Sequence, residues 1–561
     1  MSESTCHSTG TEGKGRSWER PSVTAHLHEY EEARDEGMSQ RQFAEQAGVP
    51  RTTLQHWLER KTEINESPLV VAFFESPEGL AFLHRVVLAA QFVITLMGVG
   101  GIRVVCKFLE LSGLAPFVAA GYGSQQQAIA AMEQAVVGFG QEEKRRLAEK
   151  MPHRSITICQ DETFHPETCL VAIEPSSNYI LLEQYSKKRD AAAWTDAMDE
   201  AIDGLDVDVI QSTSDEGLGI LRHVRESLGA HHSPDIFHVQ QEATRGTAGA
   251  LASQVRRADK SREETEKRVI KVFDEWEDYE ANRSGPGRPR NHEKLADEAV
   301  AEYEEAVAAE EAALKRQERA REAVRGISES YHPFDLKTGA PRQADRVSSD
   351  IDKQFQNLNE VALEASLSER CQQRIAKAYR VVKQLVATIA FFHHVVRARV
   401  DDLGLPADAE QIIHCNLIPG LYLHQVASKA KRAETRAALR ERATSVLSPV
   451  DEPGGPLSLL GDDERAVVDQ VALDCARLFQ RSSSCVEGRN GQLALHHHSL
   501  HRLLPRKLKA LTVMHNYLIL RPDGTTAAER LFAQKPRKLF DALLDKLDVP
   551  RRPAAMRRRA A

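Results

Sequence analysis

The stretch Ser155–Asp161, SITICQD, decides how this chain is interpreted. Its apolar part, Ile156–Cys159, contains β-branched residues, which favour an extended strand. The run ends on the acidic pair Asp161 and Glu162. A carboxylate just past the end of a buried strand is held on a rigid support and still reaches solvent, and active sites of α/β sheets tend to form there. We therefore interpret Asp161 as the first carboxylate of an active site.

The residues after this stretch alternate between strand and helix patterns. The predicted elements are the strands Cys169–Ile173 and Tyr179–Gln184 with a turn at 175–178, the helix Ala191–Ile202, the strand Val207–Ser212, the helix Leu218–Leu228 and the strand Asp235–Val239. An antiparallel meander joined to parallel strands, with helices on the faces, is the element order of a ribonuclease H-like domain. The predicted fold class is therefore α/β with a core of that type.

Composition excludes several classes of protein. The chain has 561 residues, too many for one domain, and its hydrophobic fraction of 41% supports several cores. Its eight cysteines include no CxxC pair, which argues against a disulfide framework and indicates a reducing cytoplasm. The N-terminus has no apolar signal core, and Gln91 and Thr95 interrupt the apolar run Val86–Val99. We expect that run to be a buried helix and the protein to have no membrane partner.

Charge is unevenly distributed along the chain. The net charge is −8, but residues 501–561 carry 15 Lys and Arg against 5 Asp and Glu. Basic clusters at Arg502–Lys509, Lys535–Lys538 and Arg551–Arg559 are suited to hold DNA phosphates in a salt-dependent, sequence-independent way. Arg506 and Lys507 are the candidate contacts in the first cluster. The third cluster is alternatively a disordered tail.

A helix-turn-helix is predicted near the N-terminus. In Tyr30–Lys61, apolar residues recur at helical spacing, and Gly48 lies where two helices would turn. Ser39 suits the N-cap of the first helix, and Pro50 or Arg51 would open the second. The second helix of such a unit enters the major groove of DNA. Its candidate DNA contacts are Arg51, Thr52, Thr53, Gln55 and His56. The alternative is an ordinary helical hairpin within a larger core.

Residues 243–480 predict a long helical insertion. The stretch is highly charged, and 293–325 has the Ala, Glu, Lys and Arg content of a helical hairpin or coiled coil. It is broken at 284–290, where Gly287–Arg290 resembles the core of an AT-hook, which lays a basic strand in the minor groove. Arg288 and Arg290 are the candidate DNA contacts there, and a plain hairpin loop is the alternative.

Three carboxylates are placed to form a metal site. Asp161 and Asp215 each follow a predicted strand, and Glu487 lies on Ser482–His498, which we expect to return as a helix to the sheet. Hard cations prefer carboxylate oxygens, and two Mg²⁺ ions about 3.5–4 Å apart can serve the entering and the leaving oxygen of a phosphodiester. The three residues therefore predict Mg²⁺- or Mn²⁺-dependent phosphoryl transfer.

Five segments carry a family resemblance: QDETFH (160–165), STSDEGLGILRHV (212–224), PDIFHVQQE (234–242), SSCVEGRNGQLALHHH (483–498) and HNYLILRPDGTTAAERLF (515–532). On these segments, most of 150–535 resembles a DDE transposase of a bacterial insertion sequence. The resemblance implies a catalytic metal triad of Asp161, Asp215 and Glu487 in a core split by a helical insertion. It also implies nicking of double-stranded DNA at transposon ends and 3′-OH strand transfer into target DNA, by a synaptic homo-oligomer in the bacterial cytoplasm at the nucleoid.

Other polar residues near the triad have less specific assignments. His238 resembles a histidine that some related transposases place near the site, and a core histidine is the alternative. Arg489 and Asn490 follow the glutamate on the same helix, where they would reach the scissile phosphate unless that face is merely exposed. Asp235 rivals Asp215 as the second ligand, but it begins a predicted strand rather than ending one.

The predicted segments are 1–25 disordered, 26–62 helix-turn-helix, 63–150 helical, 151–242 first part of the core, 243–480 helical insertion with a charged hairpin, 481–535 second part of the core with the catalytic helix, and 536–561 basic tail. Two alternatives to an active transposase stay open. One is a domesticated, catalytically inactive transposase that only binds DNA, which the three intact carboxylates disfavour. The other is a structure-specific nuclease of the same fold, which has little use for a helix-turn-helix.

Overall fold

The computed structural model describes residues 18–164, 167–282, 290–499 and 503–553. The chain divides into two compact units. Unit 1 comprises residues 1–152 and 491–561, and unit 2 comprises residues 153–490. This division differs from the predicted second part of the core at 481–535, because α20 (Pro505–Tyr517) and α22 (Leu539–Lys546) pack against α7 (Tyr122–Ala148) in unit 1.

Unit 2 is built on a five-stranded mixed sheet with the strand order β3-β2-β1-β4-β5. The strands are β1 (Arg154–Phe164), β2 (Thr168–Glu174), β3 (Tyr179–Tyr185), β4 (Val207–Ser214) and β5 (His231–Pro234). β1 is antiparallel to β2 and parallel to β4, β2 is antiparallel to β3, and β4 is parallel to β5. The predicted α/β class, with a meander that leads into parallel strands, is confirmed.

Local capping explains why several elements lie where the sequence predicts them. α8 (Ala191–Ile202) has the predicted bounds because the Asp190 carboxylate accepts a hydrogen bond from the backbone N–H of Ala193 at 3.0 Å. The turn between β2 and β3 contains Asn178 at a φ of 62°, a left-handed conformation that asparagine tolerates. α9 (Leu218–Arg222) continues into a π-helical turn at His223–Ser227, and together they correspond to the predicted helix Leu218–Leu228.

The predicted fifth strand, Asp235–Val239, is wrong in position. β5 ends at Pro234, and Ile236 opens α10 (Ile236–Ala281). The Asp235 carboxylate caps this helix, since its Oδ1 accepts from the backbone N–H of Phe237 at 2.7 Å. A short apolar run behind an aspartate fits the start of a strand and the start of a helix equally well. His238 therefore lies in the first turn of a helix, not on a strand.

One face of the sheet is covered by α8 and α9. Ile156 and Ile158 of β1 share a buried core with Trp194 of α8 and Ile220 of α9. Even-numbered residues of β1 therefore point to this face, because side chains alternate along a strand.

The other face of β1 meets the chain that leads into α19 (Ser484–Ser499). The Thr157 hydroxyl donates to the carbonyl of Leu478 at 3.2 Å, and the Cys159 thiol donates to the carbonyl of Ser482 at 3.7 Å. Asp161 is the next odd-numbered residue of β1, so it belongs to the α19 side of the sheet.

The described part of the predicted insertion is helical. Its helices are α10, α11 (His292–Ser330), α12 (Ala344–Glu364), α13 (Glu369–Arg380), α14 (Val382–Asp401), α15 (Ala407–Ile412), α16 (Ile418–Lys429), α17 (Ala433–Leu447) and α18 (Asp462–Leu478). A large buried core joins these helices, with Phe355, Phe392 and Tyr422 among its fully buried side chains. α13 and α14 are separate helices that meet at Val381.

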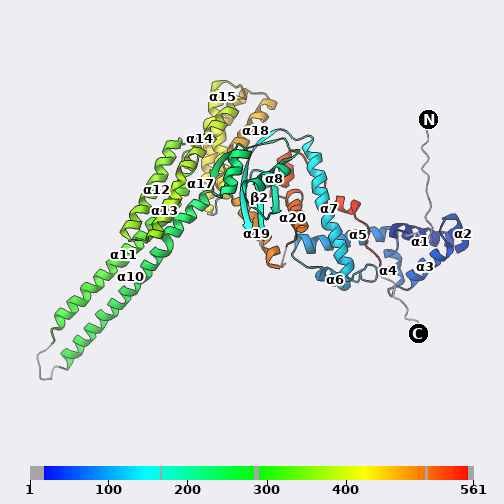
Figure 1. The fold of residues 1–561 in the computed structure, drawn as a ribbon, viewed down its shortest axis with the longest axis horizontal. Coiled ribbons are helices and arrows are strands. Elements are labelled where there is room, and N and C mark those ends of the chain that lie inside the picture. The colour runs from blue at the N-terminus through cyan, green and yellow to red at the C-terminus, as the bar shows by residue number, and fades with distance from the viewer. Residues whose placement is uncertain (1–17, 165–166, 283–289, 500–502, 554–561) are drawn as a thin grey trace. The chain divides into compact units, whose positions relative to one another are not determined.

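α10 and α11 run side by side as a long hairpin (Figure 1). Arg262 of α10 pairs with Glu310 of α11 at 2.7 Å, and Arg268 pairs with Glu302. The buried positions of α11 are small: Ala299, Ala306, Ala313 and Ala320 recur at heptad spacing. Small side chains at such a seam let two helices approach closely, which explains the alanine content of the stretch.

Unit 1 is made of helices in its described part. They are α1 (Arg20–Asp35), α2 (Gln40–Gln46), α3 (Arg51–Thr62), α4 (Pro68–Phe74), α5 (Pro77–Phe92), α6 (Ile102–Leu111), α7, α20, α21 (Ala527–Phe532) and α22. α5 continues into a π-helical turn, and within the described residues only the combined Pro77–Met97 is long and apolar enough to cross a membrane. Half of its most apolar window is buried, as in the core helix of a globular protein, so its length is weak evidence for a span.

α1, α2 and α3 form a small three-helix unit with its own core, which includes Leu27, Phe43 and Leu54. Ser39 and Gln42 form a capping box at the start of α2. Gly48 takes a φ of +64° in the turn before α3, a conformation that favours glycine. The predicted turn and helix starts are therefore as the sequence indicates.

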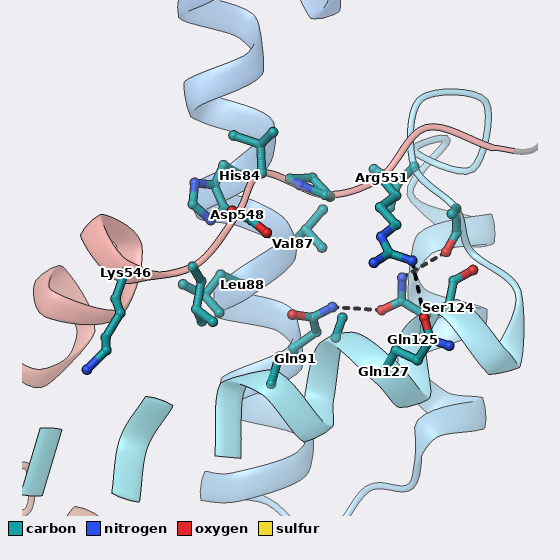
Figure 2. Close-up of a pocket in the computed structure, with 17 residues that line it drawn as sticks. His84, Val87, Leu88, Gln91, Ser124, Gln125, Gln127, Lys546, Asp548 and Arg551 are labelled. Atoms are coloured by element: carbon teal, nitrogen blue, oxygen red, sulfur yellow. Dashed lines mark hydrogen bonds between the residues drawn. The ribbon is translucent and has the colours of Figure 1, made fainter. Parts of the chain in front are cut away.

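The C-terminal segment is not a free tail in its described part. α22 occupies Leu539–Lys546, and the chain after it lies against α5 and α7 around a cavity (Figure 2). Arg551 bonds Gln127 at 3.2 Å, and Arg552 pairs with the buried Glu75. We therefore assign Arg551 and Arg552 of the third basic cluster to structure.

A leucine at Ala313 should destabilise the α10–α11 hairpin. Because Ala313 is buried at the seam, the larger side chain forces the helices apart at a cost of about 1–3 kcal/mol. Hydrogen exchange of the α11 backbone should become faster in Ala313→Leu. The matched control is Ala312→Leu on the exposed face of the same helix. Equal exchange in both variants would contradict the seam.

Candidate active site

Asp161 lies within β1 rather than just past its end. It is paired in register with Val171 of β2, and β1 continues to Phe164. The parallel pairing with β4, however, stops at Cys159 and Thr213. Asp161 therefore lies two residues beyond the last residue of β1 that pairs with β4. It is at the same edge of the sheet as the carboxyl end of β4.

Asp215 follows the last residue of β4 at the same edge. Its Oδ1 accepts a hydrogen bond from the backbone N–H of Gly217 at 3.1 Å, and Oδ1 of Asp161 accepts from the backbone N–H of Glu162 at 2.8 Å. Each bond orients its carboxylate and leaves Oδ2 without a hydrogen bond to any described residue. The two aspartates thus have the same arrangement: Oδ1 is hydrogen-bonded to the backbone, and Oδ2 is available to bind a ligand.

Glu487 lies in the first turn of α19, and its side chain is exposed. The helix is anchored two residues later by Arg489, which pairs with Glu183 of β3 through two bonds of 2.8 and 2.7 Å. Both side chains are buried, with 4% and 0% of their surfaces exposed. This pair fixes how α19 lies on the sheet and hence where Glu487 is presented.

A second anchor holds the chain that enters α19. Oδ2 of the buried Asp235 accepts from the backbone N–H of Ser483 at 2.9 Å and from its hydroxyl at 2.6 Å. Its Oδ1 caps α10 through Phe237, so both oxygens of this carboxylate are used. Asp235 is therefore a clamp between the starts of α10 and α19, and it does not compete with Asp215 as a ligand.

The electrostatics of Asp161 show which groups surround it. Burial raises the pKa of its carboxyl to about 7; the Glu162 N–H and His238 lower that pKa, whereas Asp215 and Glu487 raise it. The structure thus brings Asp161, Asp215, Glu487 and His238 into one electrostatic neighbourhood. Like charges gathered in a partly buried place are the arrangement that a bound cation relieves.

His238 points into a cavity that Asp215 also lines. The same cavity contains Glu242 and Lys377, which pair at 3.9 Å, and Glu242 also pairs with Arg245 at 3.2 Å. The imidazole is half-buried on the first turn of α10. It lies on the Asp215 side of the candidate site, although its element is a helix and not the predicted strand.

Several predicted or neighbouring residues have structural roles instead. Arg489 is buried against Glu183 and does not face solvent, which argues against its predicted contact with a scissile phosphate. Asn490 is half-buried beside it. Glu162 accepts from the Trp194 indole at 3.3 Å on the opposite face of β1 from Asp161. Glu183 was missed because a glutamate within an apolar strand carries no sign of its distant partner.

The three carboxylates are ligands of the type that a hard cation prefers, but in this structure they do not form a complete metal site. Among the described residues, no group of three or more His, Cys, Asp or Glu side chains is placed to hold a metal ion. The chemistry of three carboxylates with available oxygens suits Mg²⁺ or Mn²⁺. Glu487 is exposed, so its carboxylate is open to solvent.

The predicted DNA contacts on α3 are on its surface. Arg51, Thr52, Gln55 and His56 are exposed, and Thr53 is partly exposed. They lie opposite Leu54 and Trp57, which are buried against the rest of the three-helix unit. Gln55 bonds Glu59 at 3.2 Å on the same face. The helix therefore presents a polar surface of the kind that enters a DNA groove.

The other predicted DNA contacts differ from one another. Arg506 bonds Glu133 at 3.0 Å, and the half-buried Lys507 donates to the carbonyl of Thr95 at 2.7 Å, with its pKa lowered by burial. We assign Lys507 to the packing of unit 1. Arg290 is exposed, and Arg288 lies outside the described residues.

Breaking the pair between Glu183 and Arg489 should destabilise the protein strongly. Glu183→Leu or Arg489→Met leaves an unpaired buried charge, which costs about 3–5 kcal/mol, whereas the double substitution replaces both charges with apolar groups and should regain most of the loss. Chemical denaturation of the four proteins measures this coupling. Additive losses in the double variant would show that the pair does not anchor α19.

Asp161 should make stability depend on pH. Burial raises the pKa of its carboxyl in the folded state to about 7, above the ordinary value of 3.8. The stability that this group contributes is therefore fully present below pH 3.8 and is lost as pH rises through about 7. The fall in melting temperature between about pH 5 and about pH 8 should be smaller in Asp161→Asn than in the wild type. Asp196→Asn, at an exposed position of α8, is the control. Identical pH profiles for all three proteins would disprove the shift.

Comparisons with known proteins cover part of the chain. Residues 413–559 match the model of a family of unknown function, DUF6399. The match begins within the helical insertion and includes α19 with Glu487 and Arg489. No curated protein and no solved structure matches the chain. The part that is similar to this family thus contains the third carboxylate and its anchor, but not the two aspartates.

Proposed function

We propose that this protein is a metal-dependent DNA transposase of the DDE type with a ribonuclease H-like core. One observation carries the proposal: the carboxylates of Asp161, Asp215 and Glu487, from β1, the end of β4 and a helix on the sheet, share one electrostatic neighbourhood. Strand order supports it, since the meander followed by parallel strands is the expected frame for such a triad.

The residues of this chain would act by binding and positioning. Asp161 and Asp215 would hold Mg²⁺ or Mn²⁺ through their available oxygens, and Glu487 would complete the set from α19. When bound, the cations activate the attacking oxygen and stabilise charge on the phosphate. His238, on the Asp215 side, is placed to orient a phosphate or to hold a proton.

The parts outside the core support a DNA substrate. The exposed polar face of α3 suits the major groove and would provide recognition of the element's ends. The charged hairpin of α10 and α11 extends a rigid arm that would serve assembly of the homo-oligomer (Figure 1). These assignments favour end-specific cleavage and strand transfer over cleavage of branched DNA.

Cleavage of DNA that carries the element's own ends tests the proposal. With Mg²⁺ or Mn²⁺, the wild type should nick the ends, and Asp161→Asn, Asp215→Asn and Glu487→Gln should each lose on the order of a hundredfold or more in rate while DNA binding is retained. Glu216→Gln, an exposed carboxylate next to Asp215, is the matched control and should keep its activity.

Three results would change the proposal. Cleavage that survives Glu487→Gln would mean that another residue is the third ligand. Binding without cleavage by the wild type would establish an inactive DNA-binding protein. Protection of branched junctions rather than the ends in a footprint would indicate a structure-specific nuclease.

A further inference from the structure

A cavity of about 380 Å³ in unit 2 lies beside the segment that enters α19. Its walls come from the chain after α11, from α16 and α17, and from residues 479–484. Arg481 and Lys429 both line it, and none of its described lining residues is an aspartate or glutamate. The cavity is therefore positively charged on balance, in a chain whose net charge is −8.

Arg481 is a half-buried cation whose charge is compensated only in part by its neighbours. One of its amino groups, Nη2, donates to the carbonyl and the hydroxyl of Ser328 in the last turn of α11, where the helix dipole favours a cation. Its Nε is buried without a partner, and within the described residues Arg481 forms no ion pair with a carboxylate. Burial lowers the pKa of the guanidinium. Glu329 lies near enough to oppose this lowering of the pKa, but within the described residues it forms no ion pair with Arg481. Because charges withdrawn from water are normally paired, the cavity leaves a place for an anion.

The facing wall adds hydrogen-bonding groups without adding negative charge. The Tyr422 hydroxyl and Nδ1 of His332 are 2.6 Å apart, and both residues are buried. Burial, with Arg481 and Arg342 nearby, holds the pKa of His332 well below its usual value, so the imidazole is neutral. Burial also raises the pKa of Tyr422, so its hydroxyl keeps its proton. The wall can therefore donate to an anion and does not repel it.

The start of α19 contributes a third element. Ser482 and Ser484 line the cavity just where this helix begins, and their hydroxyls make no hydrogen bond to described residues. Ser483 differs, since its hydroxyl and N–H bond Asp235. The N-terminus of a helix carries partial positive charge and free N–H groups, which suit a phosphate.

We propose that this cavity binds an oxyanion, the phosphate group of a small molecule, with Arg481 and Lys429 as its charged contacts. The volume of the cavity indicates a small ligand. It is near the lower end of the volumes of small-molecule sites, and it is too small for a DNA duplex. Free phosphate and a mononucleotide share the chemistry that the cavity recognises. The site is separate from the carboxylates of the candidate active site, and its existence does not depend on the proposed cleavage.

Occupancy would stabilise the segment that presents Glu487. The ligand would supply the missing counter-charge to Arg481, whose backbone carbonyl also accepts from the N–H of Ile236 at the start of α10 at 3.0 Å. Because a ligand that binds only the folded state stabilises it by mass action, binding is measurable as a rise in melting temperature.

Thermal unfolding of the full chain tests the site. Inorganic phosphate and, separately, AMP are titrated at constant ionic strength, with chloride as the reference ion. Lys429→Met removes a lining cation, and Lys431→Met removes an exposed one nearby that does not line the cavity. Both phosphate-bearing ligands should raise the melting temperature of the wild type and of Lys431→Met. Lys429→Met should bind at least about tenfold more weakly, and Arg481→Met should not respond.

The outcomes are decisive even if Arg481→Met fails to fold, because the two lysine variants are compared directly. Tighter binding of AMP than of phosphate would support the site and identify a nucleotide as the better ligand. No shift with either ligand at millimolar concentration would overturn the proposal, and so would equal responses of the two lysine variants. Weaker DNA binding by Lys429→Met, without any phosphate or AMP response, would assign this surface to DNA instead.

Discussion

The buried pair between Glu183 and Arg489 is the interaction on which the candidate active site depends. It joins β3, at one edge of the sheet, to α19, which follows it only after the whole helical insertion. A bidentate pair of this kind fixes both the position and the rotation of a helix, because two parallel bonds have a single favourable geometry. Glu487 lies two residues before Arg489 on the same helix, so the pair also fixes the position of the Glu487 backbone.

The other half of the site is set by backbone pairing. Parallel alignment of β1 and β4 brings the two aspartates to one edge, and the backbone N–H groups of Glu162 and Gly217 orient them. Burial raises the pKa of Asp161, and the nearby carboxylates of Asp215 and Glu487 raise it further, so keeping this group ionised at the site costs stability. A fold maintains such repulsion only because its core and anchors outweigh it, and functional sites are where such costs concentrate.

The helical insertion contributes more than length. Its buried core holds α18 and the chain after it against the sheet, so that Thr157 and Cys159 of β1 meet Leu478 and Ser482. The clamp from Asp235 to Ser483 then ties the chain just before the insertion to the chain just after it. The chain therefore enters and leaves the insertion at one place on the sheet. The cavity for which we propose an oxyanion lies at this junction, where Arg481 is half-buried and forms no ion pair with a carboxylate of the described residues.

The sequence by itself determined the strand order of the meander, the bounds of α8 and the start of α3, because each depends on local signals such as β-branched runs, capping residues and a turn glycine. It also singled out Asp161 and Asp215, whose role as metal ligands stays a prediction. The predicted fifth strand, Asp235–Val239, was wrong, and His238 lies on a helix instead, since a short apolar run after Asp235 does not distinguish a strand from a capped helix. Only the tertiary structure decided that Arg489 is an anchor, that Asp235 is a clamp and that Lys507 belongs to a core. The partner of each of these side chains is remote in sequence, and a charge next to a motif looks the same whether it faces DNA or a buried counter-charge.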